Sequence, residues 1–138
     1  MIIDATDLIV GRLGSFAAKQ SLLGEKVDIV NCEKAVISGS RQDVLAKYKQ
    51  KRERATVATG PYISRMPDRF VRRIIRGMLP YKQEKGRKAF ERIMCYTGVP
   101  KEFEGKKMES LPSADINKRK LTKFIKVVDV CKELGAKI

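Results

Sequence analysis

The sequence predicts an α/β protein, with a three-layer α/β/α arrangement around a mainly parallel sheet of about four strands and with basic loops and extensions. The chain has 138 residues, 43% of them hydrophobic, which suits one domain with a buried core. Its first third alternates short apolar runs with helical ones, as mainly parallel sheets do. No linker rich in Gly, Ser or Pro divides the chain, so we expect residues 1–138 to form a single domain.

The predicted strands are compact apolar runs that end at turn-forming residues. Two of them are β-branched and end at Asn31 and at Ser38-Gly39-Ser40. Another, in the second half of the chain, ends before Gly98 and Pro100. The strands are expected at residues 1–5, 27–30, 35–37, 93–96 and 124–127.

The predicted helices combine apolar residues at helical spacing with recognisable end signals. Gly24 suits the end of the first helix, and Ser40 is suited to cap the second. Pro67 suits the first turn of the third, where Asp68 is favoured by the helix dipole. The helices are expected at residues 11–23, from about 40 onwards, 68–79, 88–92 and 128–134.

Three segments are predicted to lack regular structure. Residues 55–64 carry no charge and contain Gly60-Pro61-Tyr62, which indicates a turn or an extended loop. Residues 79–87 contain Pro80 and Gly86, which predict a tight basic loop. Residues 101–120 are polar and are expected to form an extended segment on the surface.

The excess of basic residues is concentrated in the middle of the chain. The sequence has 30 Lys and Arg against 16 Asp and Glu, a net charge of +14. Residues 1–40 carry a net charge of −1, residues 41–92 of +11 and residues 93–138 of +4. Such a concentration predicts a polyanionic partner. Nucleic acid is the first candidate and an anionic membrane surface is the second.

One predicted helix separates its arginines from its apolar residues. Spacings of i, i+3, i+4 and i+7 define one arginine stripe, which consists of Arg69, Arg72, Arg73 and Arg76. The opposite side holds Phe70, Val71, Ile74, Ile75 and Met78. Like charges repel each other unless an anion compensates them, and guanidinium groups bind phosphate through two hydrogen bonds. We interpret the arginine stripe as a phosphate-binding face; a plain solvated face is the alternative.

The helix that begins near residue 40 becomes more basic along its length. Its first half has an apolar face made of Val44, Leu45 and Tyr48. The same periodicity then reaches Lys51 and Arg52, so no apolar face remains. We interpret residues 47–54 as a basic segment that leaves the globular body. An ordinary solvated helix end is the alternative.

The residue types of common catalytic and metal sites are scarce. The chain has no His, which excludes histidine-based triads. Its cysteines, at positions 32, 95 and 131, have no metal-site spacing, so we predict reduced, buried thiols rather than a disulfide or zinc site. Residues 11–15 contain a G-x-x-G pattern but neither a complete dinucleotide-binding nor a Walker motif. We predict no catalytic residue, metal, cofactor or small-molecule substrate.

Neither a membrane-spanning nor a secreted protein is expected. No apolar run approaches the roughly 20 residues that a helix needs to cross a bilayer. The first residues lack a basic region followed by an apolar one, so no secretory signal is visible.

Separated motifs occur in a consistent order over nearly the whole chain. The most specific is Ile75-Arg76-Gly77-Met78-Leu79-Pro80, followed by Gly86-Arg87 and Tyr96-Thr97-Gly98. Others are Asp4-Ala5, Val10-Gly11-Arg12-Leu13, Ile29-Val30-Asn31-Cys32-Glu33-Lys34-Ala35 and Ile37-Ser38-Gly39. Together they resemble the family of large-subunit ribosomal protein L-thirteen. Gly60-Pro61-Tyr62 and Arg65-Met66-Pro67-Asp68-Arg69 resemble its archaeal and eukaryotic branch. Cys95 departs from the family, which more often has a small aliphatic residue there.

The resemblance implies a non-catalytic protein that binds large-subunit rRNA and supports its assembly. It also implies neighbouring large-subunit ribosomal proteins as partners and a location in cytoplasmic ribosomes. A free-standing RNA-binding regulatory module, a membrane-binding module and an enzyme that uses residues 11–15 on nucleotides are the alternatives.

Residues 41–92 are expected to be the main RNA-binding region. Tyr62 is suited to stack on an unpaired base, and Gly77 and Gly86 are expected to let the backbone approach RNA closely. The predicted contacts are Lys47, Lys49, Lys51, Arg52, Arg54, Tyr62, Arg65, Arg69, Arg72, Arg73, Arg76, Gly77, Lys82, Lys85, Arg87 and Lys88.

Overall fold

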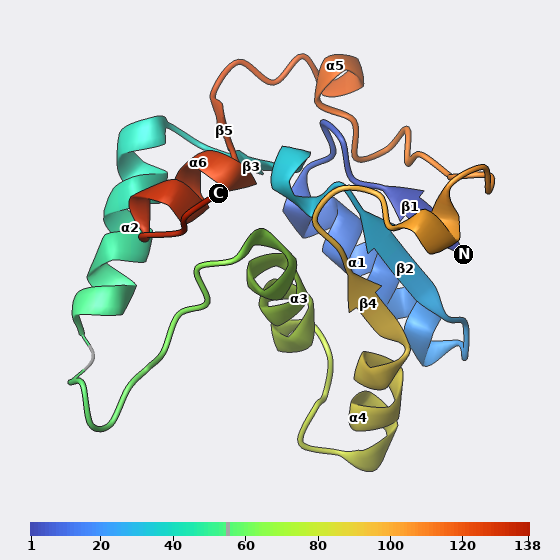
Figure 1. Ribbon diagram of the computed structural model, residues 1–138, viewed down its shortest axis with the longest axis horizontal. Coiled ribbons are helices and arrows are strands. Elements are labelled where there is room, and N and C mark those ends of the chain that lie inside the picture. The colour runs from blue at the N-terminus through green and yellow to red at the C-terminus, as the bar shows by residue number, and fades with distance from the viewer. Residues whose placement is uncertain (55) are drawn as a thin grey trace.

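The computed structural model describes residues 1–54 and 56–138 and has a small parallel sheet, seen on the right of Figure 1. Ile29 of the central strand lies opposite Ile3 on one side and Cys95 on the other. The strands lie in the order β1 (Ile2–Asp4), β2 (Val27–Val30) and β4 (Ile93–Cys95). Parallel strands joined through helices confirm the predicted α/β class.

A second sheet has two antiparallel strands, β3 (Val36–Ser38) and β5 (Phe124–Lys126). Between β2 and β3 the chain passes through a 3₁₀ turn, η1 (Cys32–Lys34), which follows Asn31 with its φ of 55°. The turn redirects the chain, so β3 pairs with a C-terminal strand instead of joining the parallel sheet. We expected about four strands in one sheet, because an apolar run indicates a strand but does not specify its partner.

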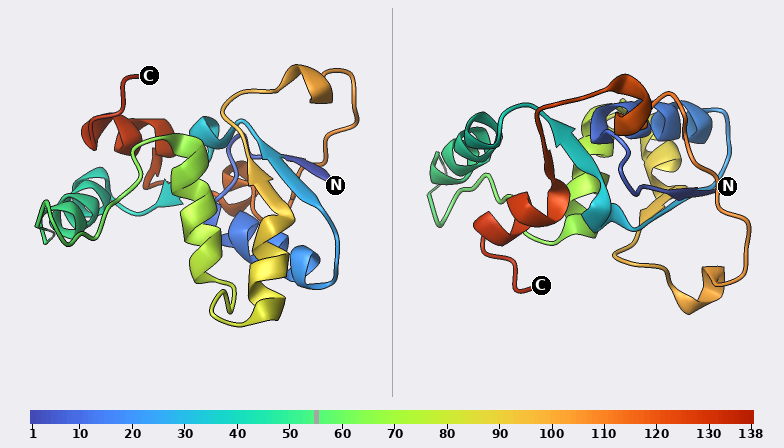
Figure 2. Two further views of the ribbon diagram at one scale, coloured as in Figure 1. Left: turned by 60° about the horizontal axis from the view of Figure 1, so that its bottom comes forward. Right: turned by 90° about the horizontal axis from the view of Figure 1, so that it is seen from above.

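Helices pack together on one face of the parallel sheet. One continuous core joins Val27 and Ile29 of the sheet to Leu13, Val71 and Ile75 of the helices. The helices are α1 (Val10–Leu22), α3 (Pro67–Gly77) and α4 (Glu84–Glu91). Residues 96–107 pass on the side of the sheet opposite α1, in place of the expected second helical layer (Figure 2).

The predicted loop at residues 79–87 is wrong in its second half, because α4 begins at Glu84. We interpreted Gly86 as a helix breaker, but it lies in the first turns of α4 and is buried. A Cβ at Gly86 would lie 2.0 Å from the carbonyl oxygen of Pro80. Gly86 is therefore required where α4 packs against the backbone of the preceding turn.

The segment at residues 101–120 is more closely attached than predicted. It contains η2 (Lys101–Phe103) and a short helix, α5 (Ile116–Arg119). Glu109 exchanges backbone hydrogen bonds with β1, donating to Ile2 at 2.8 Å and accepting from Asp4 at 3.0 Å. Its apolar residues are spaced too irregularly to show a period, yet four are buried, namely Phe103, Leu111, Ala114 and Ile116.

The predicted reduced, buried thiols are confirmed. Cys32, Cys95 and Cys131 are all free and buried. Burial, with a smaller contribution from the charge of Asp68, raises the pKa of Cys131 to about 12, so this thiol stays protonated at neutral pH. Within residues 1–54 and 56–138, no three His, Cys, Asp or Glu side chains are grouped to hold a metal ion. No helix in these ranges has the length and apolar character of a membrane span.

Asp4, at the end of β1, holds two other segments in place. Its Oδ1 accepts hydrogen bonds from the backbone and side chain of Thr6, at 3.0 and 2.7 Å, and from Nδ2 of Asn31, at 3.0 Å. Partial burial opposes ionisation, but these hydrogen bonds and the charge of Lys34 outweigh it and lower the pKa of Asp4.

Replacing Asp4 with alanine is expected to lower the free energy of unfolding by about 2 kcal/mol at pH 7, because it removes hydrogen bonds to a charged acceptor. The carboxyl has a lower pKa when folded than when unfolded. Its contribution is therefore complete above about pH 5 and is lost as the pH falls through the folded-state pKa. Urea unfolding at pH 7 and pH 3 measures both effects. A loss on acidification as large in Asp4→Ala as in the wild type would contradict this role.

Candidate nucleic-acid interface

Helix α2 (Arg41–Glu53) supplies the first group of cations. Its N-terminus forms as predicted, since the Ser40 hydroxyl accepts a hydrogen bond from the backbone N–H of Asp43 at 3.2 Å. Val44 is buried, and the ring of Tyr48 packs on Phe70 of α3 with 5.0 Å between ring centroids. These contacts fix the first two turns of α2 against the core.

We predicted that the basic segment, residues 47–54, leaves the globular body. In the structure it contacts the C-terminal part of the chain instead. Lys49 Nζ lies 3.6 Å from Glu133 Oε2 of α6 (Val127–Glu133), and Arg52 Nη1 donates to the Leu134 carbonyl at 3.2 Å. These partners lie some 80 residues further along the chain, so periodicity within α2 does not reveal them. Three further cations are exposed, namely Lys47, Lys51 and Arg54.

An irregular segment joins α2 to α3. Ala55, the first residue of the uncharged stretch 55–64, lies outside the described residues. A turn at residues 57–59 precedes Gly60-Pro61-Tyr62, with the Gly60 N–H donating to the Thr56 carbonyl at 3.1 Å, and residues 61–65 form an irregular stretch without a turn. The side chain of Tyr62 is 63% exposed, although its hydroxyl donates to the Val57 carbonyl at 3.0 Å. The ring of Tyr62 is therefore accessible, and Arg65, further along this segment, is exposed as well.

Helix α3 presents Arg69 and Arg73 of the arginine stripe away from the core, as their spacing predicts. Phe70, Val71 and Ile75 are buried, whereas Arg69 and Arg73 are exposed. Arg73 Nη1 also donates to the Tyr62 carbonyl at 3.1 Å, which ties the irregular segment to α3.

The other two arginines of the stripe have contacts that stabilise the fold. Arg72 is half-buried, with Nε donating to the Ile93 carbonyl at 2.9 Å and the guanidinium 4.1 Å from the centre of the Phe90 ring. The guanidinium of Arg76 lies 4.8 Å from the ring centre of Tyr81. Arg72 therefore joins α3 to β4 and α4, in addition to any contact that it makes with a ligand.

Replacing Arg72 with alanine is expected to lower the free energy of unfolding by about 2 kcal/mol, because charge-assisted hydrogen bonds and a cation–π contact are lost. Arg69→Ala is the matched control on the same face. As an exposed substitution it should change stability by less than about 0.5 kcal/mol. Urea unfolding of both variants measures the difference, and equal stability of the two would contradict the structural role of Arg72.

The cations around α4 point in more than one direction. Lys82, Lys85 and Arg87 are exposed. Lys88 Nζ pairs with Glu84 at 2.7 Å and lines a hollow with Gly24 and Lys26, at the end of α1. Lys88 thus lines a different hollow from the one that the cations of α2 and α3 line.

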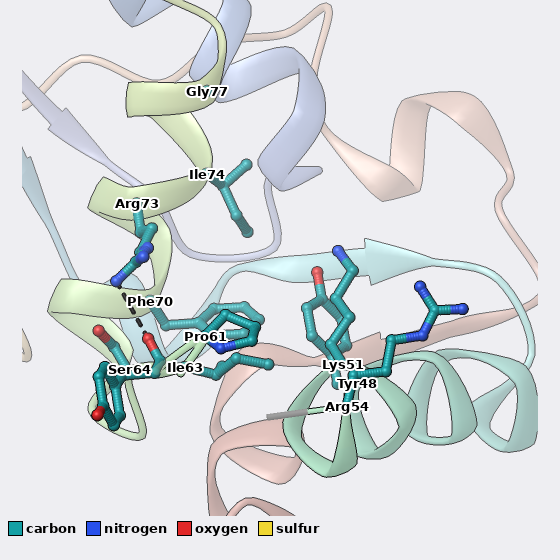
Figure 3. Close-up of a pocket in the computed structure, with 11 residues that line it drawn as sticks. Tyr48, Lys51, Arg54, Pro61, Ile63, Ser64, Phe70, Arg73, Ile74 and Gly77 are labelled. Atoms are coloured by element: carbon teal, nitrogen blue, oxygen red, sulfur yellow. Dashed lines mark hydrogen bonds between the residues drawn. The ribbon is translucent and has the colours of Figure 1, made fainter. Parts of the chain in front are cut away.

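A cavity of about 530 Å³ brings together predicted residues from three segments (Figure 3). Of the predicted contacts, α2 contributes Lys51 and Arg54, the irregular segment Tyr62, and α3 Arg73 and Gly77. Sequence reasoning missed its remaining lining residues, Tyr48, Pro61, Ile63, Ser64, Phe70 and Ile74. Tyr48 was detectable as an aromatic residue among lysines, whereas Phe70 and Ile74 have the spacing of ordinary core residues.

An α/β domain with exposed cations on three neighbouring segments around an aromatic-lined cavity belongs to the class of proteins that bind polyanions such as RNA. The comparisons with known proteins narrow this class. The model of a family described as ribosomal protein L13 matches residues 1–102. This chain belongs to the ribosomal protein L13 family.

The curated relatives match along nearly the full chain. A large ribosomal subunit protein uL13 from Methanosarcina barkeri is 46% identical over 137 residues, covering 99% of this chain and 98% of its own. Those from Methanocaldococcus jannaschii and Archaeoglobus fulgidus are each 42% identical, covering 99% and 97% of this chain and 98% and 86% of their own. These relatives are archaeal, in agreement with the branch that the motifs indicated.

Proposed function

We propose that this chain is a structural, non-catalytic component of the large ribosomal subunit. In this role it binds large-subunit rRNA, supports the packing and assembly of that RNA, and lies beside other ribosomal proteins in cytoplasmic ribosomes. Membership of the ribosomal protein L13 family carries the proposal. The net charge of +11 in residues 41–92 supports this region as the main RNA-binding part.

In the proposed interface, exposed side chains of α2, α3 and the α3–α4 connection bind phosphates along neighbouring RNA segments. Arginine suits this task because its planar guanidinium forms two parallel hydrogen bonds with a phosphate. Such contacts recognise the course of the RNA backbone, since the deep groove of A-form RNA hides the base edges. Ionic contacts of this kind release counterions, so the affinity should fall steeply with salt.

Not all sixteen predicted contact residues have equal weight in this proposal. Lys51, Arg54 and Arg69 are exposed and have no described hydrogen bond or ion pair, so their charges are available to RNA. Arg52 and Arg72 donate to backbone carbonyls of the protein. Those two act mainly by positioning the elements that carry the other cations.

Sedimentation of large ribosomal subunits through a high-salt gradient tests the proposal. A tagged copy of this protein, expressed in cells, should remain with the large-subunit peak, because a structural component is held by many contacts at once. Recovery only in the top fractions would contradict the proposal. If that free protein still bound RNA, the free-standing regulatory module would be the better interpretation.

A further inference from the structure

The cavity between α2 and α3 is open to solvent and is bordered by three segments of the chain. Its volume of about 530 Å³ lies within the roughly 300–1,000 Å³ of small-molecule sites. The second half of α2 forms one wall, α3 the opposite wall, and residues 61–64 the third side (Figure 3). Three consecutive segments within residues 48–77 thus border a space of the size that a nucleoside requires.

The interior of the cavity is apolar and aromatic. The ring planes of Tyr48 and Phe70 are inclined at 57° to each other, and the side chains of Ile63 and Ile74 line the same cavity. Tyr62 lines the same space and keeps 63% of its surface exposed. Flat aromatic and aliphatic walls of this kind accept the face of any nucleobase, because every base has a π-surface.

The rim of the cavity is cationic. Lys51 and Arg54 come from α2, and Arg73 comes from α3. Lys51 Nζ lies 5.3 Å from the centre of the Tyr48 ring, so a positive charge stands directly beside the aromatic wall. The described lining residues include three cations and no Asp or Glu. This positive charge favours an occupant that has negatively charged groups next to a flat apolar group.

We propose that this cavity binds one unpaired nucleobase that is turned out of the rRNA, with its flanking phosphates on Lys51, Arg54 and Arg73. The proposal rests on the proposed rRNA binding and adds a specific site to it. The base stacks against the aromatic walls, and the cations hold the backbone on both sides of it. An apolar side chain from a neighbouring protein would use the walls but would leave three cations without counter-charge, so the nucleotide is the better match.

The test compares two RNA probes of equal charge. One is a fluorescently labelled hexa-adenylate, and the other is the same oligomer with abasic ribose at each position. Fluorescence anisotropy at low salt measures the affinity of the full-length protein for each. A stacked base should make binding to the hexa-adenylate about tenfold tighter.

Gly77→Phe tests whether that preference arises in the cavity. Gly77 lines the cavity, and a Cβ there would meet no atom within 4 Å, so a large side chain can be placed at the cavity's edge without a clash at its Cβ. Gly11→Phe is the matched control, since Gly11 is exposed in the first turn of α1 and its Cβ would also meet nothing. Circular dichroism verifies that both variants are folded. Gly77→Phe should reduce the ratio of the two affinities to about one, whereas Gly11→Phe should retain it.

The outcomes separate the two proposals. Equal wild-type affinities for both probes would overturn the nucleobase site, leave the rRNA-binding proposal intact and favour a protein side chain in the cavity. A base preference that survives in Gly77→Phe would also overturn the site. No binding of either probe at low salt would count against RNA binding itself.

Discussion

Replacing Lys51, Arg54 and Arg69 together with glutamine is expected to weaken binding to large-subunit rRNA by about 100-fold at physiological salt. Each phosphate contact contributes roughly 0.7–0.9 to the slope of log affinity against log salt concentration. Loss of three contacts should therefore flatten that slope by about 2–3. Filter binding to an rRNA transcript at several salt concentrations measures both quantities. The fold should be retained, because these side chains are exposed and have no described hydrogen bond or ion pair.

A matched variant separates a defined interface from the effect of net charge. Lys107→Gln, Lys118→Gln and Lys123→Gln together remove the same charge from exposed positions in the C-terminal third. This variant should lose much less affinity and retain most of the salt slope. Equal losses in the two triple variants would show that only total charge matters, and would contradict the assignment of the interface to residues 41–92.

Replacing Gly86 with alanine is expected to lower the free energy of unfolding by about 3 kcal/mol or more, since overpacking against rigid atoms forces the backbone to move. The added Cβ would lie 2.0 Å from the Pro80 carbonyl oxygen and 2.8 Å from the Tyr81 nitrogen. Both are backbone atoms, so α4 would have to separate from the preceding turn. For a domain of this size, the loss corresponds to a fall in melting temperature of about 10 °C. Differential scanning calorimetry measures it.

Gly77→Ala is the control for this substitution. Gly77 is the last residue of α3, and a Cβ there would meet no atom within 4 Å. Alanine should be neutral or stabilise the protein by up to about 1 kcal/mol, because it has the higher helix propensity. If Gly86→Ala melted at the same temperature as Gly77→Ala, the close contact between α4 and Pro80 would be refuted. From the sequence, both Gly77 and Gly86 were expected to let the backbone approach RNA closely. In the structure, a side chain fits at Gly77, whereas at Gly86 it would clash with the backbone of Pro80.

Periodicity predicted those parts of the fold that depend on local sequence. Arg69 and Arg73 of the arginine stripe are exposed because the spacing of 3.6 residues per turn places them on the other side of α3 once Phe70 and Ile75 are buried. The Ser40 cap is local in the same sense. By contrast, the pairing of β3 with β5 depends on segments almost 90 residues apart, and no local pattern encodes it.

The cavity was the least predictable part of the candidate site. Each cation on its rim was expected to contact RNA, but nothing in the sequence indicated that Lys51 and Arg73 border one space. Their proximity follows from the packing of Tyr48 on Phe70, which joins α2 to α3. The difference between the exposed and the half-buried arginines of the stripe also follows from the packing of the fold and not from the local sequence. Arg72 differs from Arg69 only through the Ile93 carbonyl and the Phe90 ring, which the fold brings to it.

The most direct test of whether this protein contacts rRNA through residues 41–92 is ultraviolet cross-linking of intact large ribosomal subunits. Mass spectrometry then identifies the RNA-bound peptides. The account predicts nucleotide adducts on peptides from residues 47–54, 61–66 and 67–88. Tyr62 and Tyr48 are the expected attachment sites within the cavity. Adducts confined to residues 93–138, with none between residues 41 and 92, would contradict it.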